Sequence, residues 1–127
     1  TILGKIEQAH QRQSPEDEAR LDAEFHMAII EASHNVVMLH MMRSMFQLLR
    51  EGVFYNRQVM FCQKTRRMTL LDQHRAINSA LQQRDPDAAR AAMLAHLGFV
   101  ETALSDQQKA ERNEAVARQR IWHERQR

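Results

Sequence analysis

The sequence contains little cysteine, glycine or proline. Three glycines and two prolines in 127 residues leave few residues for turns, so connections should be few and short. Cys62 is the only cysteine, which excludes a disulfide within the chain and fits a reducing compartment. No apolar run reaches the length of a membrane-spanning helix, and the N-terminus lacks a signal-peptide pattern. We therefore expect a cytoplasmic protein.

Neither sign of charge dominates the chain. There are 18 lysines and arginines against 16 aspartates and glutamates, which gives a net charge of +2. The pI near 9.1 reflects this small excess, whereas a nucleic-acid-binding face usually carries a dense basic patch. The dominant residues are Ala, Leu, Gln, Arg, Glu and Met, which all favour helices. With 43% hydrophobic residues, the chain is expected to form one soluble all-α domain with a proper core.

Two proline-containing pairs mark the starts of helices. In Ser14-Pro15 and Asp85-Pro86 the first residue can cap a helix, and the proline suits its first turn. We therefore expect one helix from about residue 15 to residue 33 and another from residue 86 to about residue 105. The first residues of the chain, 1–12, also have a helical pattern.

The segments between these helices predict two more. His34-Asn35 should form a short turn, with the asparagine as the next cap. Apolar residues then recur at helical spacing from Val36 to about Phe61, where Gly52 can kink the helix. A polar break over residues 62–67 precedes a further helix.

The apolar positions predict an antiparallel helical bundle with short connections. After Ser105 the pattern gives way to a charged tail that either extends the last helix or frays. The sequence therefore divides into a helical domain over residues 1–105 and a C-terminal extension over residues 106–127. The residues expected to point inward in the last two helices are Leu70, Ile77, Leu81, Ala89, Met93, Leu97, Val100 and Leu104.

Two histidines share apolar faces of neighbouring predicted helices. His74 follows Leu70 by one helical turn and precedes Ile77 by nearly one, and His96 is placed similarly in the last helix. His74 precedes Asp85, at the turn, by as many positions as His96 follows it. Because equal distances from an antiparallel turn correspond to equal heights, we expect the two imidazoles to converge.

Asp22 and His26 form a second pair, one turn apart on a single helix face. If this helix packs beside the hairpin, one carboxylate and three imidazoles meet. These oxygen and nitrogen donors suit a divalent transition metal such as zinc, nickel, manganese or iron. Because buried ionisable groups are costly unless they are paired or bound to metal, a shared ion would stabilise all four.

A simpler interpretation is a set of satisfied core residues. A single inward histidine is more often a hydrogen-bonded core residue than a ligand, and Asp22–His26 can be a simple pair at the edge of the bundle. The spacing alone leaves both interpretations open. The remaining histidines lie near the termini, in a turn or on a helix surface, and are not expected to join: His10, His34, His40 and His123.

Familiar catalytic motifs are absent from the sequence. It has no Gly-rich phosphate loop, no nucleophile elbow and no H-E-x-x-H. A di-iron bundle needs Glu-x-x-His on two helices, and only Glu7–His10 matches. Cys62 has no obvious activating partner. The methionine-rich run "MLHMMRSM" is typical of core packing.

Three segments resemble the effector-binding FCD domain of FadR-subfamily GntR transcriptional regulators: "LDAEFHMAIIEASHNVVML", "LLDQHRAINSAL" and "RDPDAARAAMLAHL". The shared elements are D-x-x-x-H at Asp22–His26, H-x-x-I at His74–Ile77 and a final histidine at His96. The resemblance runs from about Ala19 to Leu104. It is nearest to the lactate- and glycolate-responsive members and more distant from the pyruvate-responsive one.

The resemblance implies an antiparallel all-α bundle, a homodimer, and a regulator that responds to a small carboxylate on its operator DNA. In the metal-containing branch of the family the ligands are one aspartate and three histidines, which correspond here to Asp22, His26, His74 and His96. The winged-helix DNA-binding domain of the family is expected to be absent from this chain. The first helix of the effector domain, which often supplies an arginine to the effector, is also expected to be missing before Thr1.

We therefore expect a ligand-sensing domain, not an enzyme, that binds a 2-hydroxycarboxylate such as glycolate or lactate through a bound metal. Four protein ligands leave two positions of a six-coordinate ion for the carboxylate and the hydroxyl. Asn78 and Arg43 are further candidates for effector contacts, although they can equally be a polar helix position and a surface charge. The alternatives are a metal-dependent hydrolase or lyase, because an open metal site can activate water, and a purely structural dimerisation bundle.

Overall fold

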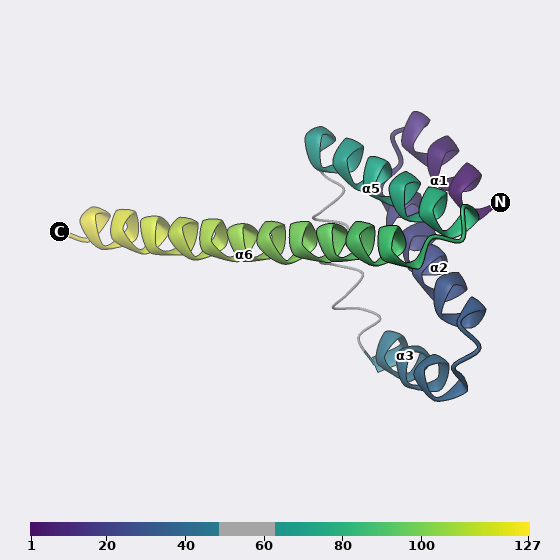
Figure 1. Cartoon of the computed structure of the whole chain (residues 1–127). Coiled ribbons are helices and arrows are strands. Elements are labelled where there is room, and N and C mark those ends of the chain that lie inside the picture. Colours follow the sequence, from purple (N-terminus) through teal and green to yellow (C-terminus); the bar gives the residue numbers. More distant parts are fainter. Residues whose placement is uncertain (49–62) are drawn as a thin grey trace.

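The computed structural model describes the backbone of residues 1–48 and 63–127 and the side chains of residues 1–45 and 63–127. All regular structure in these ranges is helical, as the composition predicted (Figure 1). The expected continuation of the third helix to residue 61, the kink at Gly52 and the environment of Cys62 lie outside the described residues. The helices are α1 (Ile2–Gln11), α2 (Pro15–Ala32), α3 (Val36–Leu48), α5 (Lys64–Gln82) and α6 (Pro86–Arg125).

The helix starts predicted at Pro15, Val36 and Pro86 are confirmed, with one difference in how they are capped. The polar break predicted over residues 62–67 is wrong in its second half, because α5 already begins at Lys64. The Asp85 carboxylate accepts a hydrogen bond from the Ala88 backbone N–H at 3.0 Å, and Asn35 Oδ1 accepts from the Met38 backbone N–H at 3.0 Å. Ser14 stands at the cap of α2 in an extended conformation, but its side chain makes no capping hydrogen bond. The start of α2 therefore rests on the fixed φ of Pro15 and on the acidic first turn.

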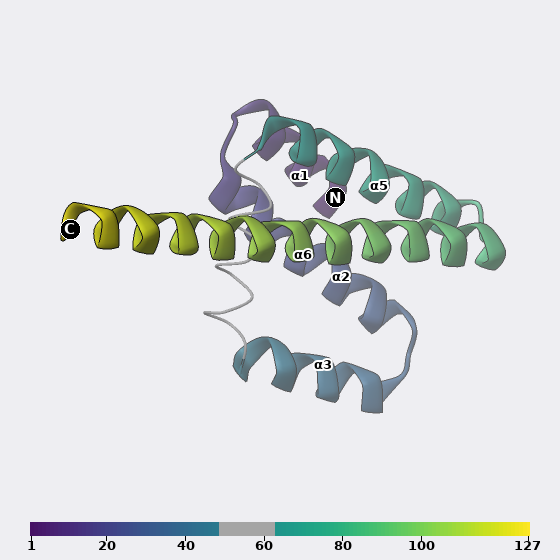
Figure 2. The same cartoon turned by 90° about the vertical axis from the view of Figure 1, so that its left-hand side faces the viewer.

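α5 and α6 form an antiparallel hairpin, and α1 packs against both α2 and α5 (Figures 1 and 2). α3 contacts α2 on the outside of this assembly. Burial of each large apolar side chain contributes about 1.5 to 3 kcal/mol, so these contacts hold the helices together. The buried apolar residues of the two core clusters are Ile6, Ala9, Leu21, Phe25, Leu71 and Ile77 in one and Ala19, Leu70 and Ala103 in the other.

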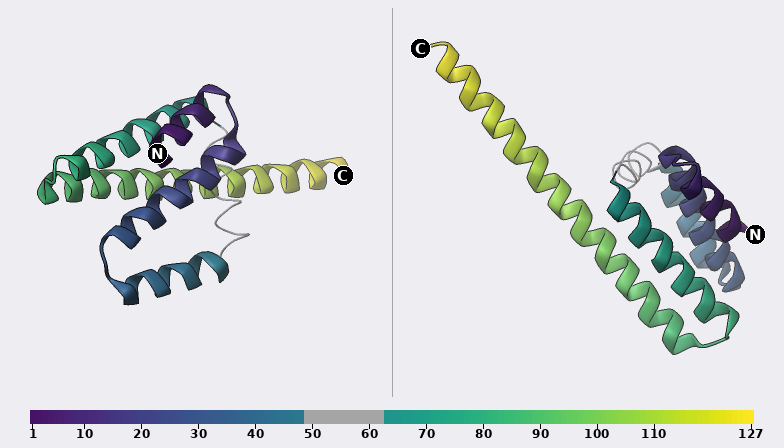
Figure 3. Two further views of the ribbon diagram at one scale, coloured as in Figure 1. Left: turned by 90° about the vertical axis from the view of Figure 1, so that its right-hand side faces the viewer. Right: turned by 90° about the horizontal axis from the view of Figure 1, so that it is seen from above.

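The charged tail continues α6 as one helix to Arg125 rather than fraying. Its C-terminal half extends beyond the other helices in every view (Figures 1 to 3). None of the helices in the described ranges is long and apolar enough to cross a membrane.

Two inward-facing predictions are wrong in detail. Leu97 is 52% exposed, because it follows the buried His96 by one residue and so lies about 100° around the helix from it. Leu81 is exposed in the last turn of α5, where it lines a pocket instead of the core. The buried stripe of α6 is narrower than its apolar residues suggested.

The methionine-rich run also differs from its predicted role in core packing. Met38, Met41 and Met45 are all exposed on α3. Only part of this helix lies against α2, so its other side has no cover in the described residues.

A buried ion pair joins three helices. Arg67 of α5 donates from Nε and Nη2 to Glu18 Oε1 of α2, at 2.8 and 2.6 Å, and from Nη2 to the backbone oxygen of His10 at 3.1 Å. Glu18 is 1% exposed. The guanidinium therefore satisfies a buried carboxylate and also donates to a carbonyl in the last turn of α1.

Candidate metal centre

The structure brings together the four residues that the spacing selected. Asp22 and His26 come from α2, His74 from α5 and His96 from α6. Each offers one ligand atom, and these atoms all lie within 4.8 Å of one another. In the described residues this is the one cluster of three or more His, Cys, Asp or Glu side chains that could hold a metal ion.

His74 and His96 converge as the hairpin argument predicted, and His26 joins them. The ring centroids of His74 and His96 are 4.9 Å apart, so the two residues do lie at the same height. The His26 ring lies 5.1 Å from that of His96 and 5.6 Å from that of His74. Packing of α2 beside the hairpin therefore completes the cluster.

The cluster is buried on all but one side. His74 is 1% exposed and His96 is 2% exposed, while the side chain of His26 is 15% exposed. His26 is therefore the least buried of the three imidazoles. Burial of a carboxylate away from water lowers the stability of the fold unless its charge is balanced by a cation or by hydrogen bonds.

The contacts within the cluster fit a shared cation. Asp22 Oδ1 lies 2.7 Å from His74 Nε2 and 3.3 Å from His26 Nε2. Yet neither ring nitrogen of His74 makes a well-directed hydrogen bond, so the oxygen is close but not in line with an N–H. An ion held between these side chains would give the two buried nitrogens of His74 a partner.

Sequence reasoning missed one polar partner of the cluster. Gln73 Oε1 lies 2.8 Å from His96 Nδ1. The hairpin argument could have found it, because Gln73 immediately precedes His74 and therefore lies at nearly the same height as His96. The contact ties α5 to α6 beside the cluster.

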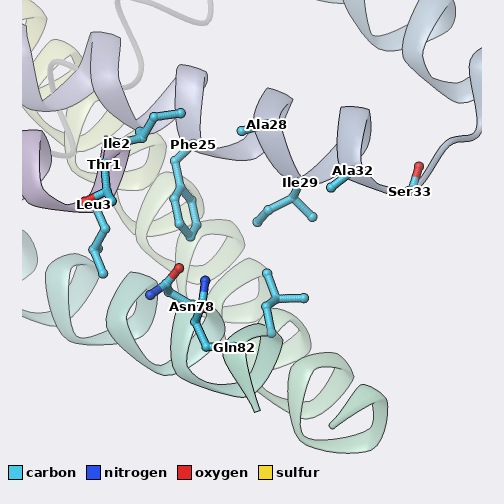
Figure 4. A pocket seen from close by; sticks show the side chains of 11 residues that line it. Thr1, Ile2, Leu3, Phe25, Ala28, Ile29, Ala32, Ser33, Asn78 and Gln82 are labelled. Carbon is cyan, nitrogen blue, oxygen red and sulfur yellow. The ribbon is translucent and has the colours of Figure 1, made fainter. Parts of the chain in front are cut away.

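A pocket of about 790 Å³ lies near the cluster, although none of the four clustered residues lines it. Figure 4 shows its lining side chains. Phe25 connects the two, because its ring lines the pocket and lies 5.0 Å from that of His74 between centroids. The wall is mostly apolar, with a few hydroxyl and amide groups. The lining residues are Thr1, Ile2, Leu3, Phe25, Ala28, Ile29, Ala32, Ser33, Asn78, Leu81 and Gln82.

The two candidate effector contacts are placed differently. Asn78 lines the pocket, and in Figure 4 its side-chain amide points toward the ring of Phe25. Arg43 is not among the lining residues. Its guanidinium is exposed on α3 and donates to Glu31 Oε1 at 3.1 Å.

Other ionisable groups stay outside the cluster. Glu24, the nearest carboxylate in sequence to Asp22, is exposed and accepts a hydrogen bond from Arg20 at 3.2 Å. No general base besides the ligands is thus placed at the centre within the described residues. The other histidines lie elsewhere, as expected: His10 beside Glu18, His34 in a left-handed turn, and His40 and His123 on helix surfaces.

Comparison with known proteins assigns the helical domain to a family. Residues 1–99 match the family model of the FCD domain. The chain belongs to the FCD family. The four clustered residues all lie within the matched segment of this FCD domain, as do the three segments on which the resemblance rested.

The curated relatives of this FCD domain are regulators of transcription. It is 41% identical over 72% of its length to the "Putative L-lactate dehydrogenase operon regulatory protein" of Escherichia coli. It is 37% identical over 68% of its length to the "HTH-type transcriptional regulator LutR" of Bacillus subtilis, and 32% identical over 71% to the "Glc operon transcriptional activator" of Escherichia coli. These matches cover 36%, 40% and 35% of the respective relatives, so the chain spans little more than a third of their length.

Proposed function

We propose that this FCD domain senses a small 2-hydroxycarboxylate, such as lactate or glycolate, through a divalent metal held by Asp22, His26, His74 and His96. The observation that carries the proposal is the buried cluster of one carboxylate and three imidazoles next to a pocket. The names of the relatives support the choice of ligand, since one refers to an L-lactate dehydrogenase operon. The same names, and the exposed position of Glu24, favour sensing over hydrolysis or elimination.

The donor set is suited to an anionic ligand. Asp22 contributes one negative charge, and the three imidazoles ligate only in their neutral form. With a divalent ion the centre keeps a net positive charge, which attracts an anion strongly in a site that excludes water. When bound, the ion would act as a Lewis acid that accepts a carboxylate oxygen and the neighbouring hydroxyl oxygen of the effector.

The pocket residues can recognise the rest of the effector. Phe25 and Ile29 offer an apolar wall to a small alkyl group, while Asn78 offers an amide that can donate to a carboxylate oxygen. Arg43, which is exposed and paired with Glu31, is the weaker of the two candidates. We keep Asn78 as the residue to test.

Effector binding is expected to depend on the metal. Calorimetric titration with lactate and with glycolate should give heat with the metal-loaded protein and none after chelator treatment, and reloading should restore it. Asn78→Ala should weaken binding about tenfold, the loss of roughly one charge-assisted hydrogen bond, with unchanged metal content. Asn113→Ala, at an exposed asparagine of α6, is the matched control and should bind like the natural sequence. Equal binding by loaded and metal-free protein would refute the mechanism.

We further propose that the domain forms a homodimer through the exposed face of α3. Val37 is 70% exposed and Met41 56% exposed, with Met45 on the same helix also open. Exposed apolar groups gathered on one element are typical of a protein–protein interface. A homodimer also matches the two-fold symmetry common among soluble oligomers.

Disruption of this face should dissociate the dimer. Met41→Glu is expected to raise the dissociation constant by at least tenfold, because a charge would be buried at the interface. Sedimentation velocity over a concentration series measures the change. Val116→Glu changes an exposed apolar residue on α6 and serves as the control. A monomer in the unsubstituted protein at high micromolar concentration, or dimers of equal strength in both variants, would contradict the proposal.

In the whole regulator, operator DNA would be bound by a separate domain, in the cytoplasm. The effector would then favour one packing of the α2, α5 and α6 helices that supply the ligands. The coupling to DNA binding can be no larger than the difference in effector affinity between the two states.

A further inference from the structure

The contact between Gln73 and His96 links the candidate centre to a group outside it. Gln73 Oε1 of α5 lies 2.8 Å from His96 Nδ1 of α6. The His96 ring is 2% exposed, and its other nitrogen, Nε2, faces the cluster and lies 3.2 Å from His26 Nε2. The two nitrogens of this imidazole therefore have separate environments.

The chemistry of the amide oxygen decides which nitrogen carries the proton. A carbonyl oxygen can only accept a hydrogen bond, so His96 Nδ1 must donate to it. A neutral imidazole has one N–H, which leaves the lone pair on Nε2. The opposite tautomer would leave Nδ1 and the amide oxygen without a hydrogen bond between them and would place a proton where a metal ligand needs a lone pair.

We propose that Gln73 is a positioning residue that holds His96 in the Nδ1–H tautomer, with the Nε2 lone pair directed into the centre. This inference rests on the proposed function, in which His96 is a ligand. It assigns different tasks to two consecutive residues of α5, since His74 ligates and Gln73 orients the imidazole contributed by α6. Removal of a hydrogen-bond partner that fixes the tautomer of a metal-binding histidine typically lowers metal affinity by about 10- to 100-fold.

Substitutions of Gln73 test whether it orients the His96 imidazole or only stabilises the fold. Gln73→Leu and Gln73→Asn both withdraw the acceptor from His96, and each is expected to lower metal affinity about 10- to 100-fold in competition with a chromophoric chelator. Gln73→Glu keeps an acceptor oxygen at the same reach and should restore affinity to within about threefold of the natural sequence. Gln83→Leu, at the exposed cap residue that follows the same helix, is the control and should have no effect.

A second readout does not involve the metal. In metal-free protein with ¹⁵N-labelled histidines, NMR correlation through the ring protons should report His96 protonated at Nδ1. In Gln73→Leu and Gln73→Asn the signals should shift toward the Nε2–H form, while Gln73→Glu should keep the Nδ1–H form. Gln73→Leu, which lacks the acceptor, and Gln73→Asn, which draws it back, are predicted to behave alike, so failure of one to fold leaves the other to decide.

The two proposals fail in different ways. Absence of metal binding by the natural sequence would refute the proposed function, while the tautomer in the metal-free protein would still test the role of Gln73. Unchanged tautomer and affinity in both Gln73→Leu and Gln73→Asn would overturn the inference. It would also be overturned by an affinity loss without a tautomer change, or by a Gln73→Glu variant as weak as Gln73→Leu.

Discussion

His74→Ala is expected to lose the bound metal and, with it, the metal-dependent part of the thermal stability. His74 is 1% exposed and lies 2.7 Å from Asp22 Oδ1, so its loss removes a central ligand from the cluster. An ion present at about 100 times its dissociation constant stabilises the folded state by about 2.7 kcal/mol. For a domain of this size that corresponds to roughly 10 °C in melting temperature.

Elemental analysis and thermal melts, each with and without a chelator, measure both effects. The natural sequence should melt at a lower temperature after chelation, whereas His74→Ala should melt at the same temperature in both conditions. His40→Ala is the control, because that imidazole is exposed on α3. Full metal occupancy in both His74→Ala and His96→Ala would show that the four residues are not the site.

Arg67→Met is expected to destabilise the fold by about 3 to 5 kcal/mol, independently of any metal. Glu18 is 1% exposed and receives both the Nε and the Nη2 hydrogen bonds of Arg67. Removal of the guanidinium leaves a buried carboxylate without these two bonds and takes one donor from the His10 carbonyl. Urea denaturation of chelator-treated protein gives the free energy of unfolding without a contribution from metal.

Two companion variants show whether burial causes this effect. Arg75→Met removes an ion pair of similar length, 3.0 Å to Glu7, that is exposed to solvent, so it should cost less than about 1 kcal/mol. The double variant Glu18→Leu/Arg67→Met removes both charges and should recover most of the lost stability. Equal losses in Arg67→Met and Arg75→Met would mean that burial of the Glu18 pair is not what makes it important.

The sequence by itself determined the helices and the residues that share a face within each of them. Asp85-Pro86 and Asn35 marked helix starts because side-chain caps and the fixed φ of proline act within a few residues. Asp22 and His26 were paired because residues four apart meet on any helix. The equal positions of His74 and His96 along the hairpin followed from the short turn at Asp85 and from the constant rise per residue of a helix. The motifs in these segments also predicted the FCD family, which the family match confirmed.

Only the tertiary structure decided how the helices meet. Spacing along the chain does not show that α2 lies against the α5–α6 hairpin. The sequence therefore could not decide whether Asp22 and His26 meet the other two imidazoles, and the packing of the helices shows that they do. For the same reason the partner of His96, the burial of Glu18 and the exposure of Leu97 and Met41 could not be read from the sequence. Periodicity assigns residues to a stripe on one helix, whereas the width of the buried stripe and the partner opposite each polar group depend on contacts between segments far apart in the chain.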